Sequence, residues 1–138
     1  MGTLIKHAQL INEGRYWMSD LLIEDDRISR IDFDINAGKH QIIDATNLIL
    51  IPGMIDDQVH FREPGLTHKA TIQSESTAAV VGGITSFMDM PNTIPNTLTL
   101  ELLEEKYAIA KRTSVANYSF YMGITQHNLD CLLYTSPS

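Results

Sequence analysis

The sequence is poor in cysteine, in basic residues and in long apolar runs, and each shortage excludes a class of protein. Cys131 is the only cysteine among 138 residues, so neither an internal disulfide framework nor a cysteine-based metal knuckle can form. Ten Lys and Arg face seventeen Asp and Glu, for a net charge of −7, which argues against a nucleic-acid-binding surface. The apolar run 48–51 stops at Pro52, far short of the roughly 18 residues of a membrane span. Residues 1–9 lack the features of a secretory signal, so the sequence predicts an acidic cytoplasmic protein.

The first fifty residues carry the signals of short β-strands. Apolar stretches at 4–5, 8–11, 19–24, 27–33 and 41–44 are separated by turn-forming sequences such as Asn12-Glu13-Gly14. Short strands at close spacing predict a small antiparallel sheet or a sandwich. We assign residues 1–52 to this β segment.

From Met54 onward the pattern changes to strand, helix, strand, helix, strand. One helix is predicted over 71–81, with Ile72, Ala79 and Val80 on one face, and a strand follows at 84–90. A second helix begins after the N-cap candidate Thr99, and a last strand covers 115–121. The apolar stripe of this second helix consists of Leu100, Leu103, Tyr107 and Ala110. Alternation of this kind predicts a parallel sheet whose functional groups gather at the carboxyl ends of the strands.

The most informative segment follows the first of these strands. Residues 53–65 read Gly-Met-Ile-Asp-Asp-Gln-Val-His-Phe-Arg-Glu-Pro-Gly. Because residues two apart on a strand share a face, we expect Asp56, Gln58, His60 and Arg62 to project together, with Asp57 facing outward. Four polar side chains at the end of an apolar strand need partners or a ligand. They form either a binding site or a self-satisfied cluster of hydrogen bonds and ion pairs.

The segment resembles the opening metal motif of the cyclic amidohydrolases, Gly-x-Ile-Asp-x-His-x-His, and is most similar to the dihydroorotase version that continues Phe/Leu-Arg-Glu-Pro-Gly. The resemblance extends through Thr67-His68-Lys69 and Gly82-Gly83-Ile84-Thr85. A second dihydroorotase signature is similar to Asp89-Met90-Pro91-Asn92-Thr93 with Pro95. The resemblance covers residues 4–130. It implies an α/β fold in which a small β-sandwich segment, 1–52, precedes the first strands and helices of a (β/α)₈ TIM barrel, 53–130.

The resemblance also implies a zinc site of one or two ions and a substrate-binding arginine. The second histidine of the metal motif corresponds to His60, whereas Gln58 occupies the position of the first. A carboxamide oxygen is a weaker zinc ligand than imidazole. Three alternatives follow: the site holds fewer metal ions, uses a shifted ligand set, or binds the metal weakly. Arg62 matches the arginine that pairs with the substrate carboxylate, and Asn92 matches the asparagine that contacts the same group. A guanidinium suits that task because it pairs bidentately with a carboxylate.

The implied reaction is hydrolysis or closure of a cyclic amide, interconverting dihydroorotate and N-carbamoyl-L-aspartate in pyrimidine biosynthesis. The catalytic carboxylate and the remaining ligands are expected further along the family's chain, so no catalytic residue is assigned here. The predicted partner is a small-molecule substrate, with no nucleic acid and no membrane, and formation of a homo-oligomer stays open. We interpret His68 and Lys69 as residues that contact loops or cap a helix, and His127 as a surface residue.

A full barrel takes about 250 residues, and this chain supplies about three of its strands and two of its helices. Residues 131–138 read as a non-native tail, so we expect a truncated and inactive piece of an active parent enzyme. An allantoinase or hydantoinase is the alternative enzyme. Because Gln58 replaces a histidine, a non-catalytic homologue that acts as a structural partner subunit is a further alternative. A free-standing α/β binding module is disfavoured by the open sheet edges.

Overall fold

The computed structural model describes residues 1–129, so the predicted tail at 131–138 lies outside the described residues. The chain divides into two compact units, residues 1–52 and a second unit that begins at Gly53. In the described part, no helix is long and apolar enough to cross a membrane.

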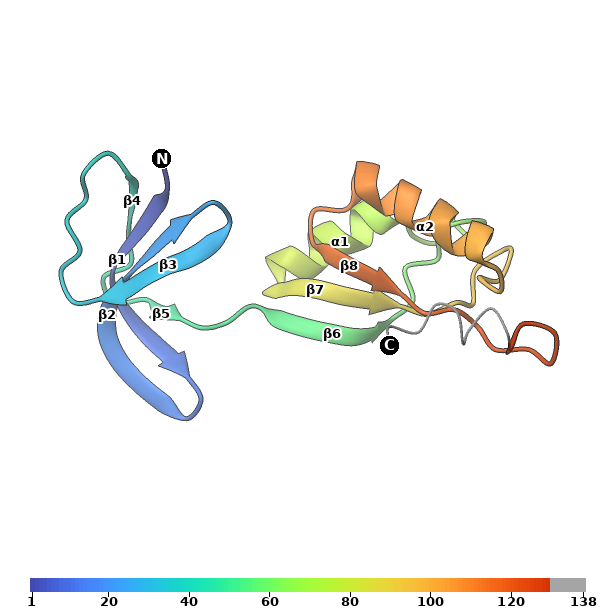
Figure 1. Cartoon of the computed structure of the whole chain (residues 1–138), viewed down its shortest axis with the longest axis horizontal. Coiled ribbons are helices and arrows are strands. Elements are labelled where there is room, and N and C mark those ends of the chain that lie inside the picture. Colours follow the sequence, from blue (N-terminus) through green and yellow to red (C-terminus); the bar gives the residue numbers. More distant parts are fainter. Residues whose placement is uncertain (130–138) are drawn as a thin grey trace. The chain divides into compact units, whose positions relative to one another are not determined.

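The first unit is a mixed sheet of five strands (Figure 1). The strands are β1 (Thr3–Asn12), β2 (Arg15–Glu24), β3 (Arg27–Asp32), β4 (Gln41–Asp44) and β5 (Ile49–Leu50). The order is β3-β2-β1-β4, with β5 also paired to β1. Residues 33–40 return the chain to the start of β1, so that β4 and β5 run parallel to it. The prediction of an antiparallel arrangement is therefore wrong for these two strands, and the described residues of this unit form one sheet.

A bulge in β1 explains why its sequence reads as two short strands. The register with β2 shifts between Ile5 and Ala8, and His7 has a φ of 60°. The Asp20 carboxylate, on a residue only 2% exposed, accepts hydrogen bonds from the backbone N–H of His7 and of Ile35, both at 2.9 Å. Burial by itself would raise the pKa of Asp20, but these hydrogen bonds and the nearby Lys6 ammonium lower the pKa below its usual value. The buried carboxylate thus pairs with the His7 N–H at the bulge and with the Ile35 N–H in the segment after β3.

The second unit is a parallel sheet with two helices on one face (Figure 1). Its elements are β6 (Met54–Val59), α1 (Ile72–Val81), β7 (Ile84–Asp89), α2 (Leu100–Thr113) and β8 (Asn117–Phe120), with the strands in the order β6-β7-β8. This is the predicted alternation. Thr99 caps α2 by accepting a hydrogen bond from the Leu102 N–H, as expected.

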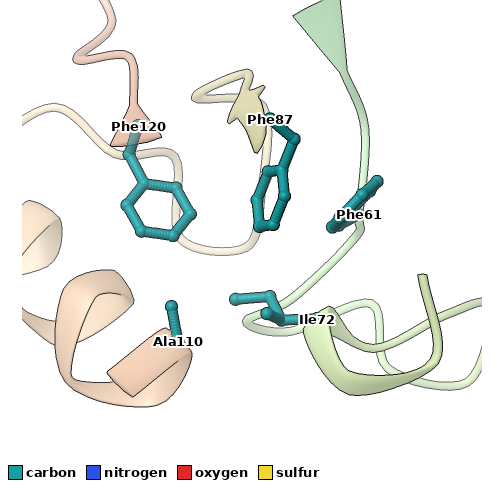
Figure 2. Close-up of a cluster of buried hydrophobic side chains, with 5 residues drawn as sticks. All are labelled: Phe61, Ile72, Phe87, Ala110 and Phe120. Atoms are coloured by element: carbon teal, nitrogen blue, oxygen red, sulfur yellow. The ribbon is translucent and has the colours of Figure 1, made fainter. Parts of the chain in front are cut away.

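The core of the second unit lies between this sheet and its helices (Figure 2). It is formed by Phe61, Ile72, Phe87, Ala110 and Phe120, which are all 7% exposed or less. The Phe61 and Phe87 rings lie 4.4 Å apart between centroids. The predicted helix stripes are only partly buried: Val80 of α1 is 42% exposed, and Leu100 and Tyr107 of α2 are 39% and 38% exposed.

Candidate functional site at the ends of β6 and β7

The carboxyl ends of β6 and β7 bring the two signature segments side by side. Val59 is in register with Asp89, and the Met90 N–H donates a hydrogen bond to the Val59 carbonyl at 3.0 Å. Beyond these pairs, the two signature segments leave the sheet. A second backbone hydrogen bond, from the Ile94 N–H to the Pro64 carbonyl at 3.2 Å, joins them again further out. The candidate site is therefore built on two loops that the ends of neighbouring strands position.

A β-bulge in β6 changes which side chains share a face. Asp56 is in register with Phe87, and Val59 is in register with Asp89, so three steps along β6 match two along β7. The extra residue breaks the simple alternation, and the adjacent Asp57 and Gln58 both line the same hollow. The expectation that Asp56, Gln58, His60 and Arg62 all share one strand face is wrong. The bulge interrupts the strand, and β6 ends at Val59.

His60 and Asn92, which come from different segments, contact one another. His60 Nδ1 lies 2.9 Å from Asn92 Oδ1. Because Oδ1 is an acceptor, the imidazole donates through Nδ1, and the lone pair of the neutral ring then lies on Nε2. Both residues are exposed. The contact orients the imidazole in the way that a second hydrogen bond commonly orients a histidine that binds metal.

Arg62 lies just beyond, in a strained backbone conformation. Its φ is 68°, in the left-handed region that a residue with a side chain seldom adopts. The Leu66 N–H donates to the Arg62 carbonyl at 3.0 Å, which closes a turn. Among residues 1–129 the Arg62 guanidinium forms no hydrogen bond or ion pair, and the residue is half-buried.

The residues after Arg62 hold this turn in place. The Glu63 carboxylate accepts a hydrogen bond from the Ile72 N–H at 2.8 Å, at the first turn of α1, where a negative charge is favourable. Gly65 has a φ of 83°, and a Cβ at this position would collide with the Ile94 carbonyl. In the Arg-Glu-Pro-Gly sequence, Glu63 and Gly65 thus anchor the loop that begins at Arg62.

Gln58 lines a hollow with a volume of about 430 Å³. It lies where β6, β7 and β8 end. Its lining consists of Asp57, Gln58, Met90, Pro91, Tyr121, Met122, Gly123 and Ile124. A volume of several hundred Å³ is typical of small-molecule sites.

The described residues supply only part of a metal site. Within residues 1–129, no three His, Cys, Asp or Glu side chains gather closely enough to hold a metal ion. His60, oriented by Asn92, fits one ligand position. His68, Lys69 and His127 are exposed. The helix-capping role considered for His68 and Lys69 belongs instead to Thr71, which caps α1 through a capping box, and to Glu63.

The sequence patterns missed one buried ion pair beside the site. Lys106 of α2 is fully buried, and its Nζ lies 2.7 Å from Asp89 Oδ2 at the end of β7. Lys106 is three residues after Leu103 and four before Ala110, so it lies within the apolar stripe of α2. A lysine within an apolar helical stripe is the sequence signal that could have indicated a buried ion pair.

Solved structures share this fold. An L-hydantoinase (dihydropyrimidinase) from Arthrobacter aurescens matches 94% of this chain with a TM-score of 0.82 and 29% identity, and 29% of that chain is covered. A dihydropyrimidinase from Brevibacillus agri NCHU1002 matches 96% of this chain with a TM-score of 0.82 and 26% identity, and 30% of that chain is covered. The α/β fold, with a histidine and an amide at the carboxyl ends of its strands, places the chain in the class of cyclic amidohydrolases.

Sequence relatives specify the family within that class. The model of the dihydro-orotase-like family matches residues 47–130, and the chain belongs to this family. A dihydroorotase of Pediococcus pentosaceus is 45% identical over 95 residues, which are 69% of this chain and 22% of the relative. A dihydroorotase of Ligilactobacillus salivarius is 40% identical over 128 residues, which are 91% of this chain and 30% of the relative. The chain therefore spans between a fifth and a third of the length of these curated relatives.

Proposed function

We propose that this chain is the part of a zinc-dependent dihydroorotase that carries the first metal ligand and the substrate carboxylate site. The whole protein would interconvert dihydroorotate and N-carbamoyl-L-aspartate. The contact between His60 and Asn92 is the observation that carries the proposal, because it joins a candidate ligand to a candidate substrate-binding residue at 2.9 Å. The similarity to proteins named dihydroorotase supports the choice of substrate.

The proposed architecture follows from the same similarity. Residues 1–52 are proposed as a β-sandwich segment, and residues 53–130 as the start of a (β/α)₈ barrel. The parallel sheet β6-β7-β8 supports this, because both helices cover one face and the signature residues follow the strand ends. Residues 131–138 are proposed as a non-native tail, and the 138 residues alone as inactive.

In the proposed site, His60 would hold zinc through Nε2, and Gln58 would occupy the neighbouring ligand position. Bound zinc would activate a water molecule and polarise the ring carbonyl. Asn92 Oδ1 is engaged by His60, so its NH₂ group is the part of the amide that can donate to the substrate carboxylate. Arg62 pairs with the same carboxylate, and its half-buried position strengthens the pair relative to open solvent.

The test compares two substrates that differ by one group. Dihydroorotate and dihydrouracil share the same ring, and only dihydroorotate carries the carboxylate. We expect the full-length protein to prefer dihydroorotate, and Arg62→Ala to reduce kcat/KM for dihydroorotate about 10- to 150-fold, as for the loss of a charge-assisted hydrogen bond of about 1.5–3 kcal/mol. The same substitution leaves turnover of dihydrouracil nearly unchanged. An equal effect on both substrates would contradict the role of Arg62.

A hydantoinase activity is the second candidate, because two of the solved structures with a TM-score of 0.82 are named hydantoinases. Faster turnover of hydantoin or dihydrouracil than of dihydroorotate would establish it, and turnover of allantoin would point to an allantoinase. A full-length protein that contains no zinc and turns over none of these substrates would instead be a non-catalytic homologue, as the glutamine at position 58 allows.

A further inference from the structure

A buried ion pair joins α2 to the last residue of β7, next to the candidate site. The Lys106 ammonium and the Asp89 carboxylate are 0% and 1% exposed, and Nζ lies 2.7 Å from Oδ2. Lys106 also donates a hydrogen bond to the Met90 carbonyl at 3.1 Å, and its ammonium lies 4.8 Å from the centre of the Phe120 ring. The cation of α2 therefore holds both the last residue of β7 and the first residue of the loop that leads to Asn92.

The second oxygen of the carboxylate reaches the other loop. Asp89 Oδ1 accepts a hydrogen bond from the backbone N–H of Phe61 at 2.9 Å. Phe61 stands between His60 and Arg62, and its ring packs on Phe87 in the core (Figure 2). Because β6 ends at Val59, this amide lies past the end of the β6–β7 pairing. A side chain on the neighbouring strand satisfies it instead.

Burying these two charges costs desolvation free energy that apolar side chains at the same positions would not cost. Apolar side chains of similar volume commonly replace a buried ion pair without loss of stability, and the surrounding cluster is apolar. An apolar residue at position 89 would, however, leave the Phe61 N–H buried without an acceptor. The pair thus provides what an apolar pair cannot, a fixed acceptor between His60 and Arg62.

We propose that Asp89, held by Lys106, is a positioning residue for the site. By fixing the Phe61 peptide, it sets the direction of the His60 imidazole toward Asn92 and the position of the Arg62 turn. This inference rests on the proposed function, since it assigns the ion pair to the alignment of a metal ligand and an anion-binding residue. Because both side chains are buried, the proposal assigns Asp89 and Lys106 no direct contact with substrate or metal.

Two double variants of the full-length protein separate alignment from stability. Asp89→Leu/Lys106→Met removes both charges and the acceptor, whereas Asp89→Asn/Lys106→Met removes both charges and retains a carbonyl oxygen for the Phe61 N–H. Leu103→Ala is the matched control, because Leu103 packs against the same core from the same helix and has no polar link to the loop. Thermal unfolding of each variant sets an assay temperature at which all are folded.

Three readouts are compared: the zinc dissociation constant from chelator competition, KM for dihydroorotate, and hydrogen exchange of the Phe61 amide. We expect the Leu/Met variant to lose zinc affinity about 10- to 100-fold, as for other residues that orient a ligand, to raise KM at least tenfold, and to lose protection of the amide. The Asn/Met variant and Leu103→Ala should stay within about threefold of the parent protein in zinc affinity and KM.

Equal behaviour of the two double variants, whether both are impaired or both resemble the parent, would overturn the inference. If the parent protein binds no zinc and turns over no substrate, the proposed function fails. Hydrogen exchange of the Phe61 amide then still tests whether residue 89 fixes the Phe61 peptide, because protection of this amide requires neither metal nor substrate.

Discussion

Removal of the Lys106 charge should destabilise the second unit more than any exposed substitution. In Lys106→Met the side chain keeps nearly its length, but the Asp89 carboxylate, itself 1% exposed, loses its partner at 2.7 Å. Breaking a buried pair by removing one member costs about 3–5 kcal/mol, because an uncompensated charge remains in the interior. The Phe61 hydrogen bond to Asp89 offsets only part of that cost. The expected loss is large against the roughly 5–15 kcal/mol that stabilises a typical domain.

Hydrogen exchange of the full-length protein measures this loss locally. Amides of β7 and α2 that exchange through opening of this unit should exchange about two to three and a half orders of magnitude faster in Lys106→Met. Lys111→Met is the matched control, because it removes the same charge from an exposed position on the same helix, and it should change stability by about 0.5 kcal/mol or less. Similar exchange in the two variants would refute the assignment of Lys106 to a tightly coupled buried pair.

Three further predictions concern the ligand position, the orienting amide and the first unit. Gln58→His should strengthen zinc retention in a chelator competition, and unchanged retention would place Gln58 away from the metal. Asn92→Asp keeps an acceptor for His60 but repels a substrate carboxylate, so zinc affinity should hold while KM rises. Asn92→Leu should impair both, and equal effects of the two variants would argue against the shared role. The lowered pKa of Asp20 means that its stabilising contribution is present above the pKa of the unfolded chain and is lost as the pH falls through the lower folded value. Acid unfolding of the first unit should therefore lose part of its pH dependence in Asp20→Asn, measured by circular dichroism, and an unchanged profile would contradict this.

Periodicity was sufficient for the order of elements in the second unit because each element has a strong local signal. Thr99 caps α2, and the alternating strands and helices occur as predicted. The first unit was harder, since the direction of β4 and β5 depends on how residues 33–40 cross the sheet. Strand direction is set by tertiary pairing, which short apolar stretches do not encode.

The candidate site shows the same division between local and tertiary information. Strict alternation cannot detect an inserted residue. The prediction that Asp56, Gln58, His60 and Arg62 share one strand face is therefore wrong because of the bulge at Asp57 and Gln58. Helical periodicity counts a lysine as polar, so the burial of Lys106 was missed, although it lies within an apolar stripe. The contact between His60 and Asn92 joins residues 32 positions apart. The predicted parallel sheet brought their two strand ends together, and the resemblance to a family singled out these two residues.

The signature residues divide into those that face the site and those that hold its loops, and this division bears on the departure at position 58. Glu63 caps α1, Gly65 packs against Ile94, and Asp89 binds the Phe61 amide. In the described chain, none of these supporting contacts involves the Gln58 side chain, which lies at a bulge. Glutamine in place of histidine would therefore change the ligands of the proposed metal site without loosening the supports of His60 and Arg62. The substitution is compatible with the proposed carboxylate site and with a proposed metal held by ligands other than residue 58.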